Sequence, residues 1–254
     1  MRRFFVLSAL LVVMSPAAFA AHNSPVGTWE VAAVEHDHGT MYLTFDDAGT
    51  LSGYGLTDKS FNFFLVAGEW EMDGHGHLSG SFTEDIAPEE ADEETTASLT
   101  FAGNVLKGNL QLDVDGDLGH SMLFGIRATM VSDVSGTWEG IWNLGHAVDH
   151  ANVMLTSIED FPGAFVIGGT GMNHSHQFDI SGTLVEDSQG RITAYLQLTS
   201  TDEEENEVEE DIHLFGHLKP KHARIDLDGV SESGEALFGK IVSHDFATDA
   251  AITF

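Results

Sequence analysis

Histidine is the residue type in this sequence with the clearest capacity for chemistry. The chain has 14 histidines, and eight of them form four close pairs: His36 and His38, His75 and His77, His146 and His150, and His174 and His176. Residues i and i+2 of a β-strand share a face, so a His-x-His pair on a strand can offer two imidazoles to one metal ion. Zinc and copper both accept imidazole, and neighbouring carboxylates can complete the ligand set.

Two of these pairs occupy the same place in an internal repeat of the sequence, after the first expected strand of each unit. We therefore take His36, His38, His146 and His150 as the candidate ligands for zinc or copper. The remaining histidines have no counterpart in the other unit, and most histidines lie beside Gly, Asp or Asn, as in a solvated turn. Surface histidines that bind no metal are accordingly the alternative interpretation.

The acidic run Asp113-Val114-Asp115-Gly116-Asp117 is a second candidate for ion binding, because it partly resembles a calcium-binding loop. An EF-hand loop requires glycine at position six and a bidentate glutamate at position twelve. Here the glycine comes too early, and Phe124 stands at position twelve. We therefore interpret this run as a hairpin turn.

The sequence contains none of the common catalytic motifs. We find no Gly-x-Ser-x-Gly, no His-Glu-x-x-His, no phosphate-binding Gly-Lys-Ser/Thr and no dinucleotide-binding fingerprint. The absence of cysteine excludes disulfides, thiolate metal sites and cysteine nucleophiles. A Ser/His/Asp set that assembles only in three dimensions is left open, but we do not expect an enzyme.

The first 20 residues have the features of a secretory signal peptide. Arg2 and Arg3 precede an apolar run over 4–14, and small residues lead to a cleavage site near Ala20. The run is too short to span a bilayer, and no later stretch approaches about 20 apolar residues. We therefore expect a periplasmic or secreted protein with no membrane insertion.

The charge of the chain excludes one class of partner. Without Arg2 and Arg3, eight basic residues remain against 41 acidic ones, which is a net charge of -33. Binding to nucleic acid requires clustered lysine and arginine that displace counterions from phosphate. A nucleic-acid partner is therefore not expected, whereas a small molecule or a metal ion is compatible with the charge.

An internal duplication organises the rest of the chain. Gly27-Thr28-Trp29-Glu30 recurs as Gly136-Thr137-Trp138-Glu139, and Leu123-Phe124-Gly125 recurs as Leu237-Phe238-Gly239. Gly68, Asp73 and Gly76 match Gly182, Asp187 and Gly190 at a constant offset of 114. The repeat predicts two units after the signal peptide of residues 1–20, namely 21–132 and 133–254.

Hydrophobic residues alternate with period two inside each unit, and Gly, Asp and Asn interrupt the runs. In the first unit this pattern predicts eight strands, near 28–36, 40–46, 49–56, 61–71, 76–83, 96–102, 105–114 and 119–130. The turns between them include Asp46-Asp47-Ala48-Gly49, Asp73-Gly74, Gly103-Asn104 and Asp115-Gly116. We predict an all-β protein of two tandem, antiparallel, up-and-down barrels with about eight strands each, with one shared barrel as the alternative.

A Gly-x-Trp motif on the first strand of a small eight-stranded meander resembles the calycin barrels, the lipocalins and avidins. The matching residues are Gly27 and Trp29 in the first unit and Gly136 and Trp138 in the second. In that family the tryptophan closes one end of the barrel, so the resemblance implies a structural role for these four residues.

Three functions remain open on these observations. The first is an exported protein that binds a small molecule in a barrel mouth or between the repeats. The second is a protein that binds zinc or copper through His and carboxylate ligands, and the third is a surface or interaction module without a small ligand. A further alternative comes from the alternating apolar residues near Phe254, which resemble the closing strand of an outer-membrane barrel.

Overall fold

The structure is a computed structural model. It describes residues 24–34, 39–56, 63–86, 95–144, 147–172, 177–201, 206–243, 245–246 and 251–253. The expected signal peptide and three of the four candidate metal ligands, His36, His38 and His146, lie outside the described residues.

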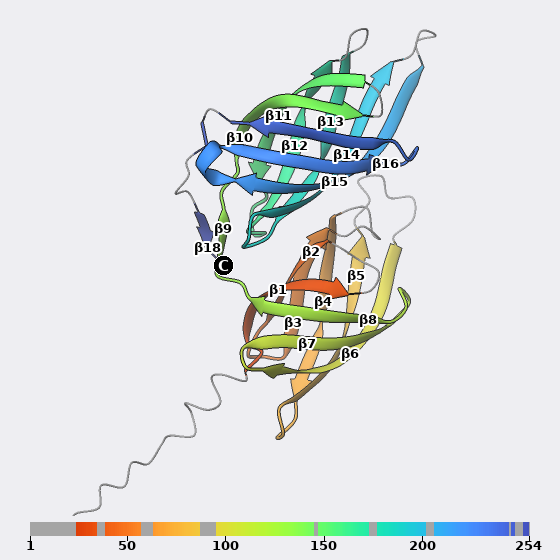
Figure 1. Cartoon of the computed structure of the whole chain (residues 1–254). Helices are drawn as coiled ribbons and strands as arrows, with labels where there is room; N and C mark the ends of the chain where they lie inside the picture. The colour runs from red at the N-terminus through yellow and green to blue at the C-terminus, as the bar shows by residue number, and fades with distance from the viewer. Residues whose placement is uncertain are drawn as a thin grey trace, which may run out of the picture.

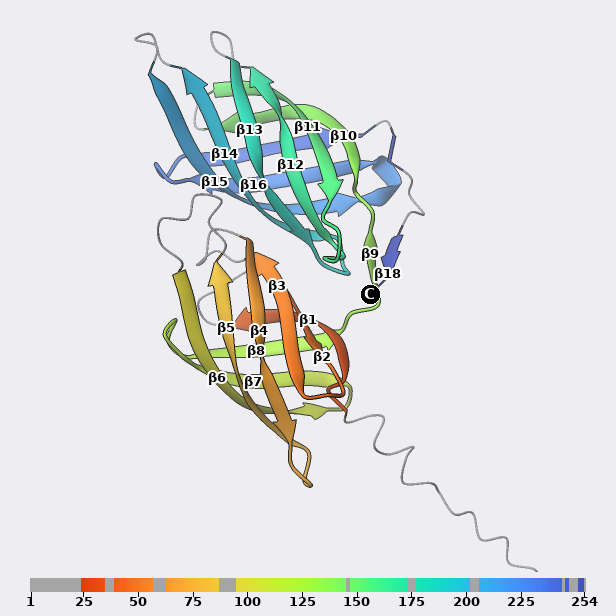
Figure 2. The same ribbon diagram turned by 180° about the vertical axis from the view of Figure 1, so that it is seen from behind.

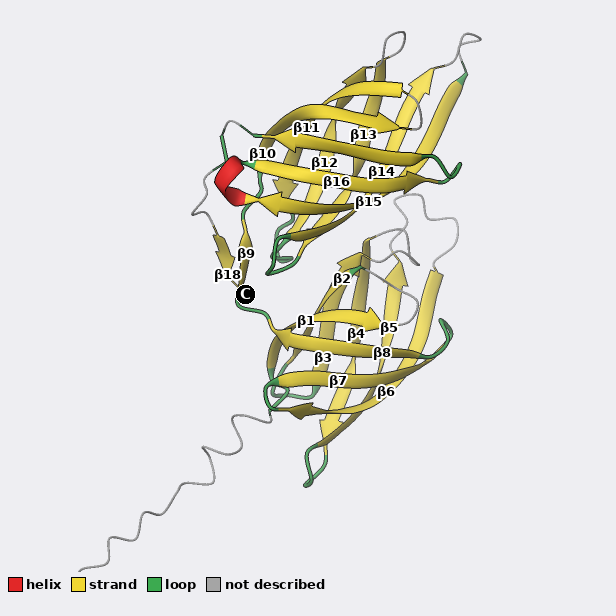
Figure 3. Ribbon diagram, viewed as in Figure 1, coloured by secondary structure: helices red, strands yellow, loops and turns green. Residues whose placement is uncertain are grey.

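The first repeat forms a closed barrel of eight antiparallel strands (Figures 1 and 3). Each strand pairs with the next along the chain, and β1 also pairs with β8, which closes the sheet. The strands are β1 (Gly27–Val34), β2 (Thr40–Phe45), β3 (Thr50–Leu56), β4 (Phe63–Met72), β5 (His77–Ile86), β6 (Thr95–Leu106), β7 (Asn109–Gly116) and β8 (Ser121–Arg127).

The second repeat forms an equivalent closed barrel, and here β10 pairs with β17. A short 3-10 helix, Pro220–His222, joins β15 to β16. The strands are β10 (Gly136–Leu144), β11 (Ala147–Ser157), β12 (Ala164–Met172), β13 (Gln177–Glu186), β14 (Arg191–Thr201), β15 (Glu207–Lys219), β16 (Arg224–Ser231) and β17 (Ala236–Val242). The prediction of two tandem up-and-down barrels is therefore confirmed.

Two of the predicted turns are wrong. Gly103-Asn104 lies inside β6, and the chain reverses after Leu106, where Lys107 and Gly108 both have positive φ. A Cβ on Gly103 would stand 2.0 Å from the main-chain oxygen of Gln111, so this glycine permits a close approach between strands. Asp115-Gly116 likewise belongs to β7, and Gly119 makes the turn.

The interior of each barrel is packed with side chains. Inward positions alternate with outward ones along every strand, and the inward aromatic residues include Trp29 and Phe101 in the first barrel and Trp138 and Trp142 in the second. The indole N–H of Trp29 donates to the Pro25 carbonyl at 2.6 Å, and that of Trp138 donates to the Val134 carbonyl at 2.9 Å. Each tryptophan thus holds the segment that enters its barrel.

Two short strands lie beside the point where the barrels meet (Figures 1 and 2). β9 (Met130–Ser132) belongs to the linker between the barrels, and β18 (Ala251–Thr253) follows the second barrel. They pair with each other in antiparallel register, with Val131 opposite Ile252. The segment that precedes the second barrel is therefore paired with the segment that follows it.

Candidate functional site

The junction between the barrels contains a hydrophobic cluster that is separate from the two barrel interiors. β2 is buried on both of its faces, because Met41 and Leu43 point into the first barrel while Tyr42 points outward. Tyr42 joins Tyr54 and Leu56 of β3 in a separate apolar cluster with Val131 of β9 and Val185 of β13. The outer wall of β2 and β3 is thus the docking surface for the second barrel.

Hydrogen bonds between described residues of the two barrels cross this junction. The Tyr42 hydroxyl donates to the main-chain oxygen of Glu186 at 2.6 Å, and the Tyr54 hydroxyl donates to that of Pro162 at 2.6 Å. The main-chain N–H of Ser188 donates to the Glu30 carboxylate at 2.9 Å. Burial raises the pKa of both tyrosines well above the ordinary value, so their hydroxyls stay protonated and can donate hydrogen bonds at neutral pH.

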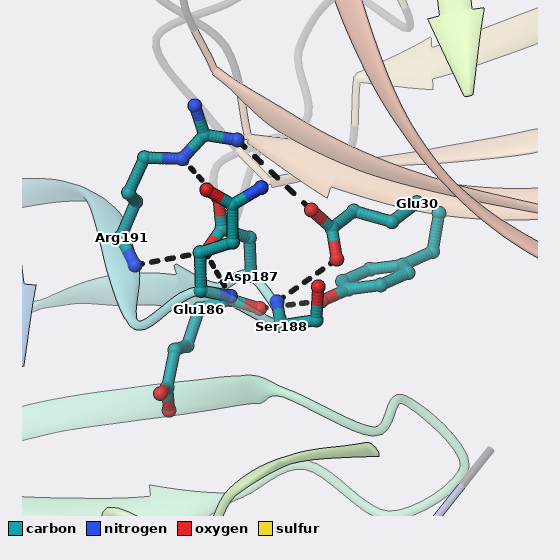
Figure 4. Close-up of polar contacts among 7 residues, drawn as sticks. Glu30, Glu186, Asp187, Ser188 and Arg191 are labelled. Atoms are coloured by element: carbon teal, nitrogen blue, oxygen red, sulfur yellow. Dashed lines mark hydrogen bonds and ion pairs between the residues drawn. The ribbon is translucent and has the colours of Figure 1, made fainter. Parts of the chain in front are cut away.

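The turn between β13 and β14 carries the acidic part of the junction (Figure 4). The buried Asp187 carboxylate accepts from the main-chain N–H groups of Gln189 and Arg191, both at 2.8 Å, and forms an ion pair with the Arg191 guanidinium. The same guanidinium stands 4.0 Å from the Glu30 carboxylate of the first barrel. One arginine therefore faces carboxylates from both barrels.

Glu186 is a polar side chain of the junction for which no ion pair with a basic residue is found among the described residues. It is fully buried, and neither of its carboxylate oxygens has a hydrogen-bond partner among the described residues. Its side chain points away from Arg191, whose guanidinium is directed at Asp187 and Glu30 (Figure 4). Burial raises the pKa of Glu186 to about 8, so this side chain is protonated at neutral pH.

A second group of interest lies on the outer wall of the first barrel. Asp113 and Asp115 are outward residues of β7, and His120 precedes β8 across the hairpin. The Nδ1 atom of His120 lies 3.3 Å from an oxygen of Asp113 and 3.2 Å from one of Asp115. All three donor atoms lie within 4.8 Å of one another, so these residues could hold a metal ion, although all three are exposed.

The second barrel keeps the carboxylates of this group but not the histidine. Asp226 and Asp228 are the equivalents of Asp113 and Asp115 in the repeat, and Gly234 stands in the place of His120. The Arg224 guanidinium binds Asp226 in two-pronged fashion, at 2.8 and 3.1 Å. The Asp226 carboxylate, which would serve as a ligand in the second barrel, is therefore already paired with the Arg224 guanidinium.

The remaining candidate histidine, His150, lies in a different environment. It is an outward residue of β11, beside Ile141 of β10 and Met172 of β12. Together with Glu139 and Lys240 these residues line a hollow of about 620 Å³ on the outer wall of the second barrel. Since His36, His38 and His146 lie outside the described residues, their role as ligands stays a prediction.

Sequence reasoning missed most of this chemistry. The interpretation of the acidic run as a turn does not reveal that Asp113 and Asp115 lie on the same outward face of one strand, where both can bind one ion. The junction residues Tyr42 and Glu186 were not considered at all. The run Met41-Tyr42-Leu43 was the available signal, because three consecutive large apolar or aromatic residues break period-two alternation and indicate burial on both faces.

Comparison with known proteins adds little. No protein-family model and no curated protein matches the chain. One solved structure, from Bacteroides fragilis and described only provisionally as an outer membrane protein, aligns over 85% of this chain and 96% of its own, with 12% identity and a TM-score of 0.27. A TM-score of that size does not establish a common fold. In the described part of the chain, no helix is long and apolar enough to span a membrane.

Proposed function

We propose that this chain is an exported binding protein that captures a divalent transition-metal ion at Asp113, Asp115 and His120. The observation that carries the proposal is the convergence of two carboxylate oxygens on one imidazole nitrogen. Ligand atoms that share a metal at 2.0 to 2.2 Å must lie within roughly 4.4 Å of one another. The two contacts to His120 already satisfy that limit.

The exposure of these residues fits capture better than a structural role. Structural zinc sites are closed and use four protein ligands, whereas this group supplies three and leaves its remaining positions to water. The net charge of -33 on the exported chain adds a long-range attraction for cations. Imidazole together with carboxylate favours zinc or copper over calcium, which prefers six to eight oxygen ligands.

Calorimetry with zinc and with copper tests the proposal. We expect the mature chain to bind one equivalent more tightly than millimolar near neutral pH, and His120→Ala or the pair Asp113→Asn and Asp115→Asn to weaken that equivalent at least tenfold. The matched control is Asp226→Asn with Asp228→Asn, which removes the same two carboxylates from the second barrel. Affinity should also fall in acid, because imidazole binds metal only in its neutral form.

Two results would contradict this function. One is that no equivalent binds more tightly than millimolar. The other is that the tight equivalent survives His120→Ala but is lost when His146 and His150 are both replaced by alanine, in which case the ligands are those of the other histidine group.

A small-molecule ligand is the second candidate function. The described junction between the repeats is packed with aromatic and aliphatic side chains, so a site in the hollow around His150 is better supported than a site between the barrels. That hollow combines the apolar Ile141 and Met172 with the charged Glu139 and Lys240. Native mass spectrometry of protein purified from its own source would detect a retained organic ligand.

A further inference from the structure

The Glu186 carboxyl lies where the linker, the first barrel and one end of the second barrel meet. The inward residues of β13 alternate, and Glu186 continues that alternation beyond Leu184, which belongs to the core of the second barrel. The main-chain oxygen of Glu186 accepts the hydrogen bond from Tyr42 of the first barrel. One residue therefore contacts the first barrel through its backbone and places its carboxyl beneath the linker.

The surroundings of this carboxyl favour its neutral form. Burial is the main cause of the raised pKa, and Asp187 and Asp133 raise it further by charge repulsion. The hydroxyl and main-chain N–H of Ser132 in β9 lower the pKa, but the effect of burial outweighs them. Across the junction, the Glu30 carboxylate and the Arg191 guanidinium face each other and Asp187 rather than Glu186, and Tyr42 is neutral.

A buried carboxyl is not a requirement of the barrel itself. The residue that matches Glu186 in the first repeat, at the offset of 114, is Met72, which is exposed. The adjoining aspartates, Asp73 and Asp187, have the same role in the two repeats. Each carboxylate accepts hydrogen bonds from two main-chain N–H groups of the hairpin that follows it. The glutamate is thus particular to the end of the second barrel that receives the linker.

We propose that Glu186 is a pH-sensitive latch, which holds the linker strand β9 in place while its carboxyl is neutral and releases that strand when the carboxyl ionises in alkaline solution. An ionised carboxylate at this position faces no cation among the described residues, and Ser132 is the one source of donors beside it there, so most of the cost of burying its charge stays uncompensated unless it reaches water. Water is reached most directly by lifting Ser132 and Val131 away from the second barrel. That movement also breaks the pairing of β9 with β18 and weakens the contact at Tyr42.

Amide hydrogen exchange of the full chain measures this opening even when the open state is rare. After correction for the intrinsic exchange rate, the protection of β9 and β18 should fall on the order of 100-fold between pH 6 and pH 9. Protection of β5 and β6 in the first barrel should change much less over the same range. Glu186→Gln, which stays neutral, should abolish the selective loss at β9.

Two further variants make the outcome decisive. Glu186→Met introduces the residue type of the equivalent position in the first barrel and should also remove the selective loss, so a folding defect of either variant alone does not obscure the result. Glu84→Gln changes another buried glutamate, within the first barrel, and should behave like the wild type. The latch is overturned if the protection of β9 in the wild type is independent of pH, or if it falls equally in Glu186→Gln and Glu186→Met.

Discussion

Replacement of Glu186 by glutamine should change how the stability of the whole protein depends on pH. Folding raises the pKa of this side chain from 4.5 to about 8, so between these values the folded protein holds a proton that the unfolded chain has released. A rise in pH therefore favours unfolding. The stability that the neutral carboxyl contributes is fully present below pH 4.5 and is lost progressively as pH rises to about 8.

The size of the effect follows from the same two values. Each pH unit across that interval costs about 1.4 kcal/mol, so the full effect is about 5 kcal/mol, and the part that falls between pH 5.5 and 8.5 is about 3 kcal/mol. Glutamine has nearly the same shape and no charge at any of these pH values. The variant should therefore lack this part of the pH dependence.

Urea unfolding followed by tryptophan fluorescence, at pH 5.5 and at pH 8.5, provides the measurement. Histidines and surface carboxylates also titrate, but their contributions are common to both proteins and cancel in the difference. Wild type should lose about 3 kcal/mol more than Glu186→Gln between the two pH values. Parallel pH profiles would refute the reasoning, because they would mean that the carboxyl is already solvated or paired in the folded state.

Three other perturbations have expected outcomes that are simple to measure. Tyr42→Phe leaves a buried carbonyl at the junction unpaired and should lower the free energy of unfolding by about 1 to 3 kcal/mol in thermal or urea unfolding. Gly103→Ala forces the backbone of β6 away from Gln111 and should lower the melting temperature more than an alanine at an exposed turn does. Sodium chloride should raise the unfolding midpoint from low to moderate concentration, because it screens the repulsion within a chain of net charge -33; a flat or falling midpoint would show that the charges do not destabilise the fold.

The fold was largely accessible from the sequence because two kinds of local information agree. Period-two alternation identified all eight strands of the first barrel, and the duplication of Gly27 and Trp29 as Gly136 and Trp138 extended the assignment to the second. The errors in the predicted turns arose because glycine occurs both in turns and inside strands that approach a neighbour closely. Gly103 looks like a turn residue, yet it serves a close approach between paired strands, which only the three-dimensional register reveals.

The candidate sites were much less accessible, because each depends on contacts between distant parts of the chain. Tyr42 meets Glu186 across 144 residues, and no local pattern predicts which outward face of a barrel a second barrel will cover. His120 reaches Asp113 only once the hairpin after β7 has its true position. Composition pointed to histidine and carboxylate side chains as candidates, but it did not indicate which of them converge.

The pairing of β9 with β18 has a consequence for how such a protein can be rebuilt. The second barrel lies between β9 and β18 in the sequence, and the paired residues Ser132 and Ala251 on either side of it lie about one strand spacing apart, roughly 4.8 Å. A domain whose two ends lie together can be exchanged for another without rerouting the chain on either side. A different eight-stranded barrel could therefore be grafted between β9 and β18 while the first barrel stays intact.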